Sequence, residues 1–68
     1  MSQTAFVQTT YRRKRHIGYS VFVEWTEKDT GFKHGRHVKT FELKDHNGNA
    51  DVALHLANIL RDGINKDC

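Results

Sequence analysis

IGYSVFVEW, at residues 17–25, decides the fold of this chain. Large apolar side chains recur in it at a period of two: Ile17, Tyr19, Val21, Val23 and Trp25. All of them are β-branched or aromatic, the types that suit a pleated, half-buried surface. A helix, turning by about 100° per residue, would scatter them around its axis. The stretch therefore predicts the central strand of a small sheet.

A strand is also predicted before it, at residues 4–11. Ala5, Val7, Thr9 and Tyr11 alternate on one side there, and Phe6 lies on the other. The run at residues 12–16, RRKRH, cannot be buried and must form an exposed connection. If the two strands pair, this connection is a hairpin tip that carries four positive charges.

A turn is expected at residues 27–31, where Asp29 can bond its own backbone and Gly31 can adopt a positive φ. Residues 32–35 continue this loop, with Phe32 folding back as a lid on the sheet. A third strand is expected at residues 36–43, with Phe41 and Leu43 on its core face. Val38 is out of phase with them, and a bulge near residues 39–40 would reconcile the pattern.

A second turn, KDHNG at residues 44–48, leads into a helix. Asn49 suits the N-cap, and Asp51 places a negative charge in the first turn. Gly63 fits a left-handed position just after the last turn, followed by a contact from Ile64. Apolar residues at helical spacing form a broad stripe: Val52, Ala53, Leu56, Ala57, Ile59 and Leu60.

The order strand, strand, strand, helix predicts an α+β fold, a three-stranded antiparallel sheet packed in two layers on one C-terminal helix. We expect one domain over residues 1–68, frayed at 1–3 and 65–68, without a linker or a second domain. Tyr19, Val21, Val23 and Trp25 would face the helix, with Trp25 packing near Leu56. The other face of the central strand, open to solvent or a partner, carries Ser20, Phe22, Glu24 and Thr26.

Size and charge favour a binding module over an enzyme. A chain of 68 residues buries only about 60% of its unfolded surface, too little for a deep catalytic cleft or a small-molecule site. Residues 1–39 carry eight basic and three acidic side chains, and residues 40–68 carry three basic and five acidic. This asymmetry suits an anionic partner, although a solubilising surface explains a net charge of +3 about as well.

No cofactor, metal or membrane is expected. His34 and His37 are three residues apart, but no Cys-x-x-Cys or His-Glu-x-x-His pattern accompanies them. Cys68 is the only cysteine, so we expect no internal disulfide, no catalytic thiol and a reducing cytoplasm. No apolar run approaches the roughly 20 residues that span a bilayer.

The basic run is the strongest functional signal. Arg12, Arg13 and Arg15 present planar forks that suit phosphate oxygens, and Lys14 adds a fourth charge. A solvated hairpin tip is the plain alternative, but four adjacent cations repel one another without benefit to stability. Other residues are expected to extend this site: Tyr11 or Tyr19 by stacking on a base, and Lys33, Arg36 and Lys39 if the second loop lies near the tip.

The pattern resembles the arm-type, AP2-like DNA-binding domains at the N-termini of tyrosine recombinases. The resemblance covers about residues 17–60: the aromatic strand GYSVFV, the turn DTG, a polar strand through Thr40 and Phe41, and the helix. It implies DNA binding through the sheet face opposite the helix. Here that face carries Phe22 and Glu24 where such domains carry basic and polar residues. We expect no recombinase activity, because no catalytic domain follows.

A second hypothesis belongs to another class. Small single-domain proteins without a catalytic motif are typical of phage or mobile-element products that block a host machine, anti-CRISPR proteins included. Phe22, Trp25 and Phe32 beside an arginine-rich tip have the composition of a protein-interface hot spot. The sequence thus leaves two partners open, a nucleic acid and a host protein or nucleoprotein complex.

Overall fold

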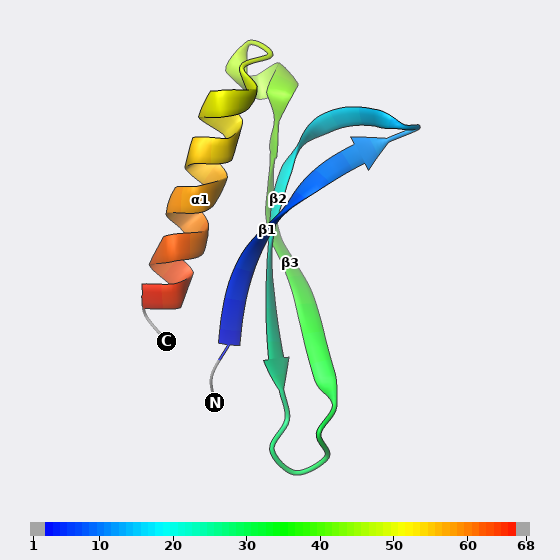
Figure 1. Cartoon of the computed structure of the whole chain (residues 1–68), viewed down its shortest axis with the longest axis vertical. Helices are drawn as coiled ribbons and strands as arrows, with labels where there is room; N and C mark the ends of the chain where they lie inside the picture. The colour runs from blue at the N-terminus through cyan, green and yellow to red at the C-terminus, as the bar shows by residue number, and fades with distance from the viewer. Residues whose placement is uncertain (1–2, 67–68) are drawn as a thin grey trace.

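The computed structural model describes residues 3–66 and shows a three-stranded antiparallel sheet with one C-terminal helix (Figure 1). The predicted β-β-β-α architecture is confirmed, with sheet order β1-β2-β3. The elements are β1 (Gln3–Arg12), β2 (Arg15–Thr26), β3 (Lys33–Glu42), the short 3-10 helix η1 (Leu43–His46) and α1 (Ala50–Lys66). Gln3 belongs to β1, and Asn65 and Lys66 belong to α1, whereas the sequence predicted frayed ends at these residues. Residues 1, 2, 67 and 68 lie outside the described part.

The core lies between α1 and the face of the sheet that the sequence predicts. Ala5, Val21, Val23 and Ala57 form its buried centre, and Val21 is completely buried. Around this centre pack partly buried residues: Val7, Tyr19, Trp25, Val38, Phe41, Leu60 and Ile64. The predicted core face of β2 is therefore confirmed.

The helix meets the sheet through small side chains. Ala53 and Ala57 are fully buried, whereas Leu56, the expected neighbour of Trp25, is only half-buried. Val52 and Ile59 were expected in the apolar stripe, but they are 41% and 55% exposed. Alanine lets the helix approach the sheet closely, which narrows the buried strip and leaves both side chains on its flanks.

Two local features fix the register of β3. Gly18 is buried opposite Glu42, where an added Cβ would lie 2.2 Å from the carbonyl oxygen of Phe41, so only glycine fits. Further along, β2 pairs with Lys39 and then with His37, which leaves Val38 as the extra residue of a bulge. The bulge was predicted one or two residues later, and it brings Val38 onto the core as expected.

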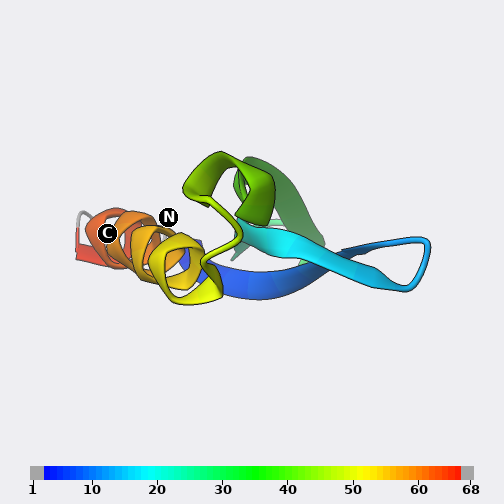
Figure 2. The same cartoon turned by 90° about the horizontal axis from the view of Figure 1, so that it is seen from above.

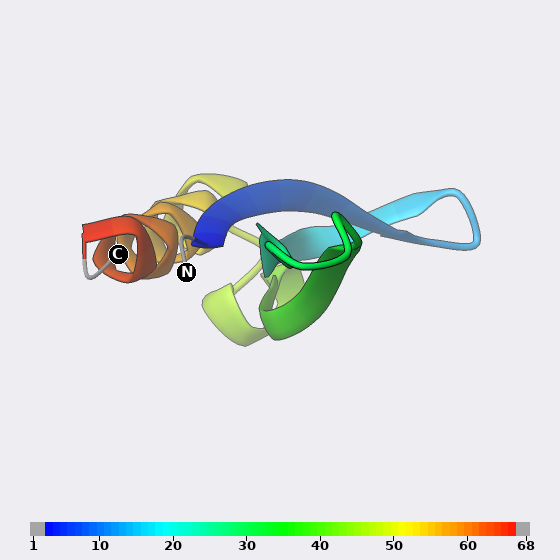
Figure 3. The same cartoon turned by 90° about the horizontal axis from the view of Figure 1, so that it is seen from below.

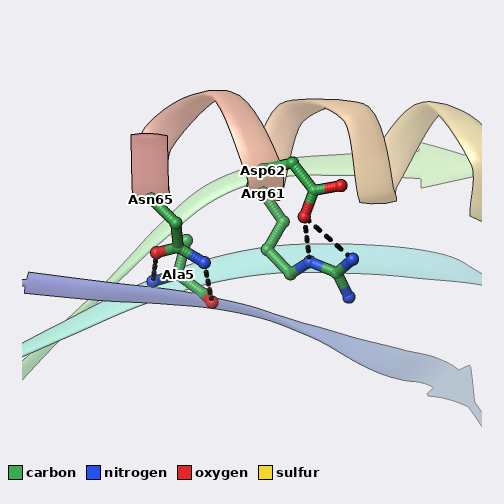
Figure 4. A network of polar contacts seen from close by, with 4 residues as sticks. All are labelled: Ala5, Arg61, Asp62 and Asn65. Carbon is green, nitrogen blue, oxygen red and sulfur yellow. Dashed lines mark hydrogen bonds and ion pairs between the residues drawn. The ribbon is translucent and has the colours of Figure 1, made fainter. Parts of the chain in front are cut away.

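The N-terminus of α1 is as predicted, and its C-terminus is not. The Oδ1 atom of Asn49 accepts bonds from the backbone N–H groups of Asp51 and Val52, at 3.1 and 3.3 Å. Gly63, expected to end the helix, lies inside it. The helix continues because the Asn65 amide accepts a bond from the N–H of Ala5 at 2.7 Å and donates one to its carbonyl at 3.1 Å (Figure 4). This pairing also covers part of the free edge of β1.

The loop from β2 to β3 is shorter than expected. β3 begins at Lys33, so residues 33–35, predicted as loop, pair with β2. Phe32 is 67% exposed and is not the predicted lid. Gly31 has the expected positive φ, 75°, and its N–H bonds the carbonyl of Glu27 at 2.9 Å.

The connection from β3 to α1 is more ordered than a simple turn. Leu43, expected in the third strand, begins η1. Asn47 and Gly48 follow η1 with positive φ values, which matches the Asn-Gly signal in the sequence. Across residues 3–66, no helix has both the length and the apolar character that crossing a bilayer requires.

Candidate functional site

The basic run forms the connection between β1 and β2, as predicted. Arg12 pairs with Arg15, which leaves Arg13 and Lys14 as a two-residue turn. Both turn residues have positive φ, 52° and 65°, as a type I′ hairpin turn requires. We call Arg12, Arg13, Lys14 and Arg15 the tip. All four are exposed.

The tip projects away from the body of the molecule. Figures 2 and 3 show the β1–β2 hairpin extending to the side opposite α1. Within residues 3–66, none of the four tip side chains has a hydrogen bond or an ion pair. Arg12, Arg13 and Arg15 line a shallow hollow together with Ile17. Their charges are therefore free to meet an anion.

Aromatic rings form the base of the tip. Tyr11 is 62% exposed, and its ring centre lies 5.8 Å from that of His16. His16 in turn meets Tyr19 edge-on at 4.9 Å, and Tyr19 packs against the core. Of the two tyrosines expected to stack on a base, Tyr11 is exposed and Tyr19 is partly buried against the core.

The basic residues of β3 do not join the tip. Lys33 pairs with Thr26 at the far end of β2, about 35 Å from Arg15 at the rise of a strand. Arg36 and Lys39 oppose Val23 and Val21, on the face of the sheet that carries the helix. The Nζ atom of Lys39 lies 5.1 Å from the centre of the Phe41 ring. The predicted single patch is thus divided into separate sites.

The opposite face, which we call the open face, carries a row of hydroxyl groups. Ser20 was expected to be exposed but is 2% exposed, because its Oγ bonds Thr10 on β1 and Thr40 on β3. The Ser20–Thr40 distance is 2.8 Å, and Nε2 of His37 lies 2.7 Å from the same Thr40 hydroxyl. We call Thr10, Ser20 and Thr40 the hydroxyl row. It links all three strands.

An aromatic row lies beside the hydroxyl row. We define it as Phe6, Phe22 and His37, which occupy one line across the three strands. Phe6 and Phe22 stack with ring centres 5.7 Å apart and an interplanar angle of 20°, and His37 meets Phe22 edge-on at 5.3 Å. Phe6 and Phe22 are half-buried and His37 is exposed. Sequence reasoning selected Phe22 and missed Phe6 and His37, because only strand register shows that they are neighbours.

The histidines do not form a metal site in the described residues. His34 stacks on Trp25 on the helix side of the sheet, whereas His37 meets Phe22 on the open face. Among residues 3–66, no group of three or more His, Cys, Asp or Glu side chains could hold a metal ion. Cys68 lies outside those residues.

Comparisons with protein-family models, with curated proteins and with solved structures found no match to this chain.

Proposed function

We propose that this chain is a small, non-enzymatic nucleic-acid-binding module whose tip contacts the phosphate backbone. The observation that carries the proposal is the backbone of Arg13 and Lys14, both with positive φ. Residues other than glycine, asparagine and aspartate rarely adopt this conformation, which costs each of them of order 1–3 kcal/mol. Strain of this kind is found mainly at functional sites.

The residue types found in the turn also support a phosphate backbone as the partner. Type I′ turns favour Asn-Gly, so arginine and lysine contribute nothing to the turn itself. Together with Arg12 and Arg15 they place four cations, unpaired within residues 3–66, at the end of a projecting hairpin. Their mutual repulsion is relieved when phosphates bind and counterions are released. Arginine forks bind phosphate oxygens in pairs, and Tyr11 is exposed beside them for stacking on a base.

The fold is compatible with this role. A three-stranded sheet with one helix resembles the arm-type, AP2-like domains, although Phe22 and Glu24 replace the basic residues those domains carry on the open face. Lys33, Arg36 and Lys39 serve in this proposal as secondary contacts, away from the tip. We place the activity in the cytoplasm, where nucleic acid is accessible.

Charge reversal at the tip tests the proposal. Arg12→Glu combined with Arg15→Glu should weaken binding to every sequence alike, because phosphates carry no sequence information. The slope of log Kd against log salt should fall by about two to four for duplex DNA. Fluorescence anisotropy across a salt series measures both effects. The fold should survive, which circular dichroism checks.

The matched control reverses two exposed charges elsewhere, Lys28→Glu with Lys66→Glu. This variant has the same net charge as the tip variant and should keep most of the salt slope. If both variants weaken binding equally, only net charge matters and the tip is a solvated turn.

A second candidate function is inhibition of a host protein machine or nucleoprotein complex, as phage-encoded inhibitors perform. One observation favours it: the ring of Phe32 is 67% exposed on the β2–β3 loop. A parent chain that binds no nucleic acid at low salt, and loses capture of a protein partner on Phe32→Ser, would establish this candidate instead.

A further inference from the structure

We propose that the open face binds unpaired bases, so that the ligand is a single-stranded nucleic acid with its phosphates on the tip. This inference rests on the proposed function of the tip and adds a second site to it. The open face is the side of the sheet away from α1, whose Ala57 and Leu60 belong to the core on the other side.

The aromatic row offers the chemistry that unpaired bases require. Phe6 and Phe22 are held parallel at 5.7 Å, and both remain half-exposed. A base in a duplex keeps its flat faces inside the helical stack, so only an unpaired base can stack on these rings.

The hydroxyl row lies between the aromatic row and the tip. Along β2 the order is Arg15, then Ser20, then Phe22. Hydrogen bonds from Thr10 through Ser20 and Thr40 to His37 fix these side chains before any ligand arrives. A surface ordered in advance loses little entropy on binding. The hydroxyl groups of Thr10 and Thr40, which are only partly buried, can also bond base edges or sugar oxygens.

The spacing defines the length of the ligand. Arg12 lies six positions after Phe6 on β1, a span of about 20 Å at the rise of a strand. A stacked strand that rises about 3.4 Å per nucleotide covers this span with about six nucleotides.

Charge along this path is favourable. Glu24 pairs with Thr4, beyond the aromatic row as seen from the tip, so it does not lie between the two sites. Glu42 is on β3, and its Oε2 lies 3.6 Å from Nζ of Lys44, which offsets its charge. Phosphates running from the aromatic row to the tip therefore pass along β1 and β2, where residues 3–23 carry no acidic side chain.

The experiment compares a fluorescent 12-nucleotide thymidine oligomer with a hairpin duplex of equal phosphate number, at low salt. The parent chain should bind the unpaired oligomer at least tenfold more tightly. Phe22→Leu keeps an apolar side chain in the sheet and should weaken oligomer binding about tenfold. It should leave the salt slope unchanged, because no phosphate contact is lost. Phe32→Leu is the matched control and should bind like the parent.

Two further measurements do not depend on whether Phe22→Leu folds correctly. His37→Ala changes an exposed member of the aromatic row and should weaken oligomer binding about threefold with the fold intact. Oligomers of four nucleotides should bind much more weakly than those of eight, while eight and twelve should differ little.

The outcomes separate the two proposals. Equal affinity for oligomer and duplex, with Phe22→Leu and His37→Ala without effect, overturns the single-strand inference and leaves the tip function in place. Binding to neither ligand overturns both. Loss of binding in the tip variant together with the predicted losses in the aromatic row supports both.

Discussion

The chain places two consecutive residues at positive φ in two connections, with different residue types in each. Arg13 and Lys14 at the tip have φ values of 52° and 65°, and Asn47 and Gly48 between η1 and α1 have 56° and 75°. Asparagine and glycine are the residues that adopt left-handed conformations most readily. Arginine and lysine are not. The two connections are thus alike in their φ values and opposite in residue choice.

The two pairs of residues differ in how well they suit the backbone conformation that they adopt. The Asn47–Gly48 connection is stabilised by its own hydrogen bonds, since the N–H of Gly48 bonds the carbonyl of Leu43 at 2.7 Å and that of Asn49 bonds His46 at 2.9 Å. The tip backbone is closed by the pairing of Arg12 with Arg15, and its side chains have no hydrogen bond or ion pair within residues 3–66. Turn propensity therefore explains the residues Asn47 and Gly48, and it does not explain Arg13 and Lys14.

The largest effect is expected when Arg13 and Lys14 of the tip are replaced by asparagine and glycine, the residue types found at positions 47 and 48. Arg13→Asn with Lys14→Gly should stabilise the fold by about 2 kcal/mol, because backbone strain is relieved at two positions. In the same variant the slope of log Kd against log salt should fall by about two, because two cations are removed. Thermal unfolding and salt-series anisotropy measure the two effects on one protein. A variant that is no more stable than the parent shows that the tip is unstrained.

The reverse exchange sharpens the comparison. Asn47→Arg with Gly48→Lys should destabilise the fold by a similar amount, about 2 kcal/mol, because the strain of the tip is reproduced there. Net charge rises by two, yet tip binding should change little. Chemical denaturation gives the stability. A marked gain in affinity would mean that cations bind nucleic acid wherever they are placed, and that the tip is not special.

The smallest effect concerns a glycine that its position does not require. Gly63 lies inside α1, and an added Cβ would meet nothing within 4 Å. Gly63→Ala should therefore stabilise the chain by about 0.5–1 kcal/mol through the helix propensity of alanine. Thermal unfolding checks it, and nucleic-acid binding should be unchanged. Destabilisation would instead indicate that the helix ends before Gly63.

Sequence reasoning was correct where a local pattern has one physical solution. Alternation at residues 19–25 predicts a strand with one apolar face, and Asn49 can cap only the start of the helix that follows it. A run of four cations cannot be buried, so its exposure and its place at a hairpin tip were also predictable. Two predictions from local sequence were wrong. Gly63 does not end the helix, because the pairing of Asn65 with Ala5 extends it, and Phe32 does not cover the sheet but is exposed.

The amino-acid sequence by itself determined the strand order, the helix, the core face of β2 and the basic tip, because periodicity, capping and charge act between near neighbours in the chain. Only the tertiary structure decided strand register, and register depends on contacts between residues far apart in sequence. It buries Ser20 between two other hydroxyl groups, aligns Phe6 with Phe22 and His37, and extends α1 to the pairing of Asn65 with Ala5. It also separates Lys33 from the tip by the length of β2, because antiparallel pairing places consecutive turns at opposite ends of a sheet.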